Sequence, residues 1–200
     1  KWKRLIINVV ANKHLCHLTV ASCIPLSISN IINMELLEIL NKIEVTPGCK
    51  LINREHPISV TNNNLPEDLE YYFKHYDGIQ LFEDQPYGVE IVGLNDFRVT
   101  NEVLFPEDDV IWEELEGDQS ENWYMIAKAE ELEQFISIDL DEDRKGYCYD
   151  SFLETHANPG SSLIIAKSFT ELLEKLLESK GENWFWIKDD FVGYGDAYND

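Results

Sequence analysis

The segment NWYMIAKAEELEQFISIDLDEDRKGYCYDSF, residues 122–152, gives the clearest indication of the fold. Three runs in and beside it, 122–129, 133–140 and 146–153, are rich in aromatic and β-branched residues and are separated by short polar segments. Such runs are typical of successive strands. In the middle run Ile136 and Ile138 share one face, as the two-residue period of a strand requires. We therefore predict three neighbouring strands, with the second and third joined as a hairpin.

The connection within this predicted hairpin is acidic. It holds four acids within five positions and is closed by a glycine: Asp139, Asp141, Glu142, Asp143 and Gly146. An EF-hand calcium loop requires glycine at its sixth position and glutamate at its twelfth, where this chain has Arg144 and Asp150. A glycosidase-like carboxylate pair needs one acid in an apolar pocket, whereas adjacent acids at a loop tip stay hydrated. We interpret the segment as the polar turn of a hairpin.

Two amphipathic helices are predicted outside this region. In LPEDLEYYFKHYDG, residues 65–78, apolar side chains recur at helical spacing and Gly78 follows where a helix would stop. In SFTELLEKLLES, residues 168–179, Ser168 and Glu171 form a capping box ahead of an apolar stripe.

Weaker patterns complete the predicted fold. They indicate a helix over 34–43, a loop over 44–64, a strand over 87–94, a short helix around 108–116 and a strand over 163–166. The fold class that follows is α+β: a single domain with a mixed or mainly antiparallel sheet, packed by the helices at 66–76 and 168–179.

The chain has a large negative charge. Its 38 acidic and 16 basic residues give a net charge of −22, which would repel nucleic acid and anionic membranes and attract a basic protein. Solubility is the alternative explanation of the same charge. No apolar run reaches the roughly 18 residues that span a bilayer. The four cysteines include no C-x-x-C pair, which favours reduced thiols and a cytoplasmic protein.

The first 33 residues differ from the rest, because they contain four bases and no acid. "KWKR" followed by "LIINVVA", with "VASC" at 20–23, is compatible with a lipoprotein signal. However, Asn12 and Lys13 interrupt an apolar region that a signal peptide needs continuous over about 7–15 residues. We favour an N-terminal extension outside the core at 1–33, dispensable for stability and binding. A domain at 34–182 and an acidic aromatic tail at 183–200 follow.

Catalytic and metal-binding signatures are missing from the sequence. It contains no G-x-S-x-G, H-E-x-x-H, P-loop or G-x-G-x-x-G motif, and its histidines are scattered without an obvious nucleophile. We therefore expect no enzyme activity, no cofactor and no metal site. An unrecognised enzymatic or metal site remains the third of three hypotheses, behind the two given below.

The order of the elements resembles the SMI1/KNR4 family (the SUKH superfamily) over residues 34–180. The segments that carry the resemblance are 65–78, "YGVEIVGL" at 87–94, 122–152 and "IAKSFTELLEKLL" at 165–177. The residues that match the family pattern are Pro66, Gly78, Gly88, Gly93, Trp123, Asp139, Gly146, Ser168 and Phe169. One departure is the turn after the Trp123 strand, where the family often has glycine and this chain has "AEELEQ".

The resemblance implies a binding protein. Many bacterial members are similar to immunity proteins that bind and neutralise a cognate toxin domain, often a nuclease. Eukaryotic members resemble regulatory interaction scaffolds, which is the alternative function. For the immunity function we expect a basic toxin domain as partner, with no nucleic acid or membrane partner.

Candidate partner contacts are acids on projecting loops and two aromatic anchors. The acids are Glu113, Glu114, Glu116 and Asp118, followed by Asp141, Glu142 and Asp143. The anchors are Trp184 and Trp186, because tryptophan is enriched at binding hot spots. The alternatives are a solvated acidic face and tryptophans that cover the sheet edge or the last helix.

Overall fold

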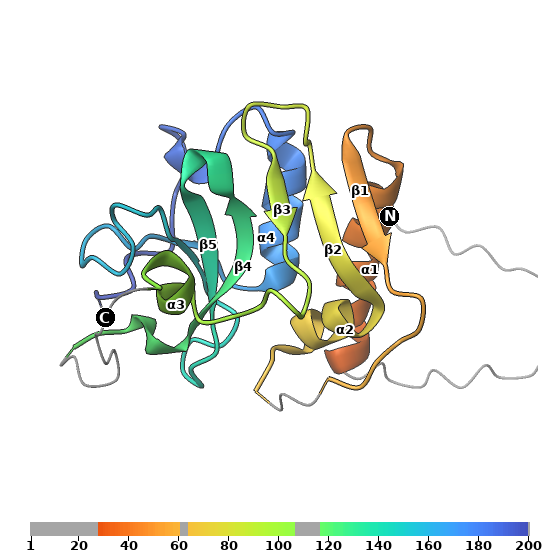
Figure 1. The fold of residues 1–200 in the computed structure, drawn as a ribbon, viewed down its shortest axis with the longest axis horizontal. Helices are drawn as coiled ribbons and strands as arrows, with labels where there is room; N and C mark the ends of the chain where they lie inside the picture. The colour runs from red at the N-terminus through yellow and green to blue at the C-terminus, as the bar shows by residue number, and fades with distance from the viewer. Residues whose placement is uncertain (1–27, 61–63, 107–116, 200) are drawn as a thin grey trace, which may run out of the picture.

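A seven-stranded antiparallel sheet forms the centre of the protein, and its strands lie in the order of the chain (Figure 1). The computed structural model describes residues 28–60, 64–106 and 117–199. The strands are β1 (Cys49–Asn53), β2 (Tyr76–Leu81), β3 (Val89–Ile91), β4 (Trp123–Ala129), β5 (Gln134–Asp139), β6 (Cys148–Asp150) and β7 (Ile164–Ala166). The predicted α+β class is confirmed.

The three strands predicted from residues 122–153 are β4, β5 and β6, and they are neighbours. Trp123 pairs with Asp139, and Ile138 pairs with Cys148. The β4–β5 connection is the short helix η3 (Glu130–Leu132) followed by Glu133, which has φ 52°. A residue other than glycine in this left-handed region carries a strain of about 1 kcal/mol. The β4–β5 hairpin therefore forms without a glycine in its connection.

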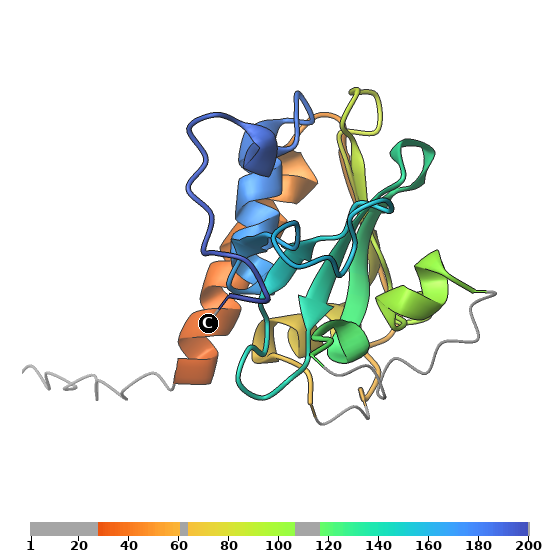
Figure 2. The same cartoon turned by 90° about the vertical axis from the view of Figure 1, so that its left-hand side faces the viewer.

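Three helices cover one face of the sheet (Figure 2). They are α1 (Ile28–Val45), α2 (Glu67–His75) and α4 (Phe169–Ser179), and they pack against one another. The predicted N-cap of α4 is present, since Ser168 Oγ accepts a hydrogen bond from Glu171 N. The second bond of the predicted capping box is shifted by one residue, because Glu171 Oε2 accepts from Lys167 N and not from Ser168 N. The apolar stripe of α4, beginning at Phe169, is buried in the main core.

The other face is covered only in part. The short helix α3 (Thr100–Leu104) lies there, over β4 (Figure 2). Half-buried Val103 and Leu104 pack on buried Met125 and Phe135. Every residue of β5 is therefore buried, on both faces of the strand.

Some predicted boundaries differ from the structure. The first helix begins at Ile28 and not at Met34, and β1 lies inside the predicted 44–64 loop. The helix predicted over 66–76 ends at His75, and Gly78 lies within β2. The short helix predicted around 108–116 falls outside the described residues. No described helix is long and apolar enough to cross a membrane.

The C-terminal segment packs on the domain. Ile164 N donates to Gly195 O at 2.9 Å and Ala197 N donates to Ser162 O at 2.9 Å, so residues 194–197 run along the outer edge of β7. This contact satisfies backbone groups that an edge strand would otherwise expose. The side chain of Lys175, on α4, adds to it: its Nζ lies 4.9 Å from the ring centre of Tyr194 and 5.3 Å from that of Phe191.

Candidate protein-binding surface

Asp139 anchors the acidic hairpin from inside the protein. Its carboxylate is fully buried and accepts four hydrogen bonds, from Trp123 Nε1 (3.2 Å), Tyr149 OH (2.9 Å), Arg144 Nε (3.1 Å) and Asp141 N (2.8 Å). Burial raises the pKa of Asp139, while its hydrogen bonds and the charge of Arg144 act against that rise. The network ties the loop to β4 and β6.

The other three acids of this loop lie toward solvent. Glu142 and Asp143 are exposed and Asp141 is half-buried. Asp141 Oδ1 accepts a hydrogen bond from Asp143 N at 3.0 Å, and Gly146 closes the turn with φ 93°. The four acids that look alike in sequence therefore separate into one structural carboxylate and three surface charges on a fixed turn.

Asp118 lies beside this loop. It accepts hydrogen bonds from Ser120 Oγ (2.9 Å) and Tyr198 OH (3.0 Å), and its neighbour Gln119 accepts one from Arg144 Nη1. The structure thus brings Asp118 and the hairpin loop together. The remaining acids of the first predicted group, Glu113, Glu114 and Glu116, lie outside the described residues.

The two candidate anchor tryptophans are buried. Trp184 and Trp186 stack with ring centres 5.3 Å apart and belong to the main core, next to α4 and with Tyr87 against Trp184. Their exposed fractions are 7% and 5%. This placement matches the alternative interpretation, in which they cover the last helix, and leaves little of either ring for a partner.

A buried histidine close to Asp118 escaped the sequence analysis. Asn101 Nδ2 donates to Ser120 Oγ at 2.9 Å, which turns Asn101 Oδ1 toward His156 Nε2 at 2.8 Å. The imidazole therefore carries its proton on Nε2. Burial lowers the pKa of His156 to about 4, although the charge of Asp118 acts in the opposite direction. The side chain is neutral at pH 7 and binds Asn101 of α3, which in turn binds Ser120.

We expect His156 to make the protein sensitive to mild acid. Between its ordinary pKa of 6.5 and about 4, the unfolded chain binds a proton that the folded protein does not, so stability falls as pH falls. Replacing His156 with glutamine should remove about 2 kcal/mol of the loss between pH 7 and pH 5, measured by urea unfolding. Equal losses in both proteins would show that His156 protonates freely in the fold.

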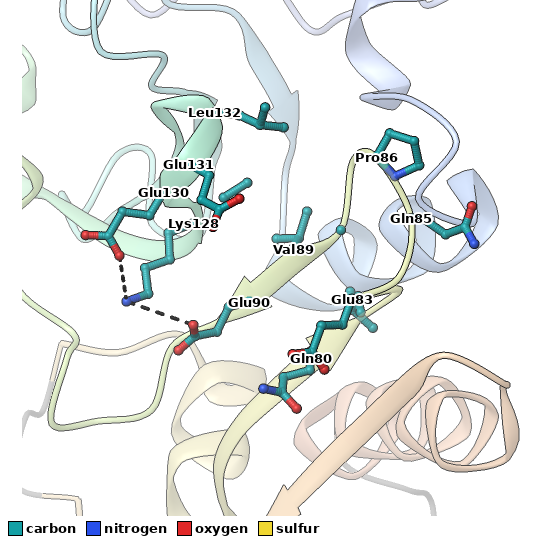
Figure 3. A pocket seen from close by; sticks show the side chains of 13 residues that line it. Gln80, Glu83, Gln85, Pro86, Val89, Glu90, Lys128, Glu130, Glu131 and Leu132 are labelled. Atoms are coloured by element: carbon teal, nitrogen blue, oxygen red, sulfur yellow. Dashed lines mark ion pairs between the residues drawn. The ribbon is translucent and has the colours of Figure 1, made fainter.

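A groove forms a second acidic surface (Figure 3). It lies between the β2–β3 turn and the β4–β5 turn and has a volume of about 290 Å³. Four carboxylates line it: Glu83, Glu90, Glu130 and Glu131. Lys128 Nζ is positioned between two of them, 3.9 Å from Glu90 and 3.7 Å from Glu130. The pairing of Glu90 with Lys128 across β3 and β4 creates this arrangement.

Sequence reasoning missed the groove because its two walls come from distant segments. Glu83 and Glu131 are 48 positions apart in the chain, and neither belongs to a long acidic run. In β3, Val89 and Ile91 are buried on one face and Glu90 is exposed on the other. This alternation was the one feature of the sequence that could have indicated an exposed acid at this position. Within the described ranges, no group of three or more metal-ligating side chains is arranged to hold an ion.

The chain is similar in sequence to known proteins over most of its length. The profile of the SMI1 / KNR4 family (SUKH-1) matches residues 59–175. The immunity protein YokJ of Bacillus subtilis (strain 168) is 34% identical over 167 residues, which cover 83% of this chain and 97% of YokJ. No solved structure gives a significant match.

Proposed function

This chain belongs to the SMI1/KNR4 family (SUKH-1), and from that membership we propose that it is an immunity protein that binds and neutralises a cognate toxin domain. The observation that carries the proposal is the 34% identity with an immunity protein along 97% of that relative. A similarity that extends over nearly a whole relative makes the same kind of function the simplest inference. The family resemblance and the missing catalytic motifs point the same way, toward a protein that acts by binding.

We further propose that the toxin is basic and that an acidic surface of this protein contacts it. The net charge of −22 supports this, as do the acids around Asp118 and the hairpin loop and those of the groove. A nuclease, for example, needs a basic groove because its substrate is a polyanion. An acidic partner would be drawn to such a groove quickly and would cover it.

Co-expression tests the function directly. Candidate toxin domains, taken first from the genes that neighbour this one, are expressed in a sensitive host, with and without this protein. We expect growth only when this protein is present, and a stable complex when it is purified with a catalytically inactive toxin. Growth arrest in both cultures, with no complex formed, would contradict the proposal and favour a regulatory scaffold.

The hairpin loop gives a kinetic prediction. Changing Asp141, Glu142 and Asp143 to their amides should slow association with the toxin about threefold or more at low salt and leave the fold intact. The difference should shrink above about 0.15 M salt, where the screening length is roughly 8 Å. Stopped-flow or surface-based kinetics would measure it.

A matched control removes the same charge elsewhere. Glu35, Glu38 and Glu174 are exposed on the helical face of the protein, and their change to glutamine also neutralises three charges. If the loop variant associates no more slowly than this control, the loop contributes only to net charge and is a turn without a steering role.

A further inference from the structure

We propose that a pocket beside Asp118 receives a tyrosine or tryptophan side chain of the toxin, whose O–H or N–H group donates a hydrogen bond to His156 Nδ1. The inference rests on the proposed immunity function and adds to it one specific contact and a chemical requirement for the partner. The pocket is separate from the groove of Figure 3 and has a volume of about 550 Å³. Its lining includes Phe105, Asp118, Leu153, His156, Pro159 and Tyr198.

The first step of the argument is an unpaired nitrogen. His156 is 5% exposed, its Nδ1 atom is buried, and no described residue forms a hydrogen bond with that atom. Buried polar atoms are nearly always paired, so an unpaired one in a pocket wall marks a place for a partner. His156 lines the pocket, whereas Asn101, which binds its other nitrogen, does not. The Nδ1 edge of the ring is therefore the one that can face the pocket.

The second step is the direction of the hydrogen bonds. The carboxylate of Asp118 can only accept, so Ser120 Oγ donates to it, at 2.9 Å. Ser120 Oγ then accepts from Asn101 Nδ2, and Asn101 Oδ1 accepts from His156 Nε2. Because His156 is neutral at pH 7, its imidazole carries a single proton, and Nδ1 presents a lone pair. The pocket therefore requires a donor, and the nearby Asp118 and Glu154 oppose an anion.

The third step is the wall of the pocket, which is largely apolar. Phe105 and Leu153 are half-buried in it, so their side chains can yield to a ligand that reaches the covered nitrogen. Tyr198 adds a second ring, but its OH donates to Asp118 at 3.0 Å and is not available to His156. Aromatic walls favour an aromatic ligand. A phenol or an indole has a flat apolar body and one neutral donor, as this pocket requires.

A cationic donor fits the pocket less well. A lysine or arginine would have to bury its charge against the apolar wall, which costs more than burying a neutral phenol or indole. The one half-buried carboxylate, that of Asp118, already accepts hydrogen bonds from Ser120 and Tyr198.

The position of the pocket favours the toxin as the source of the aromatic group. Gln119, next to Asp118, accepts a hydrogen bond from Arg144 of the hairpin loop, so the pocket adjoins the loop that we propose as a contact surface. Tyrosine and tryptophan are enriched among the residues that dominate binding energies, and such residues insert into pockets of the partner.

Long-range ¹H–¹⁵N spectra of the imidazole side chains follow the contact directly. In the complex with inactive toxin, we expect the His156 Nδ1 resonance to move to lower frequency, because the atom then accepts a hydrogen bond. His75 is the internal reference with the opposite tautomer, since its Nδ1 lies 2.8 Å from Tyr71 O, which can only accept. An unchanged His156 Nδ1 resonance in a formed complex would overturn the inference.

Dissociation kinetics give a second measurement. His156→Gln should speed dissociation from the inactive toxin about tenfold, because the acceptor is lost. The matched control is His75→Gln on α2, which also replaces an imidazole by an amide and should leave dissociation unchanged.

Replacements in the toxin identify the donor without altering this protein, so they decide the question even if His156→Gln does not fold. Replacing one tyrosine or tryptophan by phenylalanine should speed dissociation about tenfold and return the Nδ1 resonance to its position in the unbound protein. If only a lysine or arginine replacement does so, or if no replacement does, the aromatic contact is wrong.

Failure of this inference can be told from failure of the proposed function. If the wild-type protein does not bind the toxin, the immunity function itself is wrong. If it binds, and His156→Gln dissociates at the wild-type rate with the Nδ1 resonance unmoved, immunity stands and the pocket receives no aromatic side chain.

Discussion

Replacing Asp139 with alanine is expected to lower the free energy of unfolding by about 3–5 kcal/mol, a large part of the stability of a domain of this size. The substitution removes one carboxylate and leaves three donor side chains without their acceptor: Trp123 Nε1, Tyr149 OH and Arg144 Nε. Trp123 and Tyr149 are fully buried, so water cannot replace the lost acceptor. Urea unfolding followed by tryptophan fluorescence measures the loss.

Two further variants give this prediction its controls. Asp139→Asn should cost less than alanine, because it keeps the size of the side chain and one acceptor oxygen. It should still destabilise the fold, because it loses the charge facing Arg144 and presents an NH₂ group to one of the donors. Asp141→Ala, two residues along, removes a half-buried acid that holds only Asp143 N, and should cost less than about 1 kcal/mol. If Asp139→Ala costs no more than Asp141→Ala, the network around Asp139 does not stabilise the fold.

The same residue shows how far the sequence could be interpreted. Alternation in the middle run predicted strand β5 and its hairpin correctly, because the period of a strand is a local property of the chain. It could not tell Asp139 from the acids that follow it. That distinction depends on Trp123 and Tyr149 meeting above the strand, with ring centres 4.1 Å apart, and on the cover over the second face of β5.

The C-terminal segment shows the opposite limit. Aromatic residues that alternate with acids are equally compatible with a free tail that binds a partner and with a tail that folds back. The structure selects the second arrangement through contacts that are distant in sequence. These are the stacked Trp184 and Trp186 beside α4, and the backbone hydrogen bonds of residues 194–197 to the edge of β7. Local patterns carry no information on such pairing.

The groove illustrates the same limit for a candidate site. Each of its walls is an ordinary polar turn, and only the register of β3 against β4 places Glu90 next to Lys128. The other wall includes the turn that follows β2, and β2 had not been predicted as a strand. The position of that turn beside β3 was therefore not available from the sequence.

Gly93→Ala is the second substitution with a large expected effect, and it tests the packing that fixes this register. Gly93 lies two residues after the end of β3, and a Cβ atom added there would lie 2.1 Å from Asp77 O and 2.9 Å from Asp77 C. Both contacts are with backbone, so the clash can be relieved only if β2 and the segment after β3 move apart. We expect a loss of about 3 kcal/mol or more, at the upper end for overpacking.

The control for this substitution is Gly78→Ala in β2, one position from Asp77. Its Cβ atom would meet Ile52 Cδ1 at 3.3 Å and Ile91 O at 3.4 Å, and the end of an isoleucine side chain can yield by a few tenths of an ångström. The control should cost less than about 1 kcal/mol. Equal stabilities of the two alanine variants would show that β2 and β3 can separate freely, and that the groove is not held in a preformed shape.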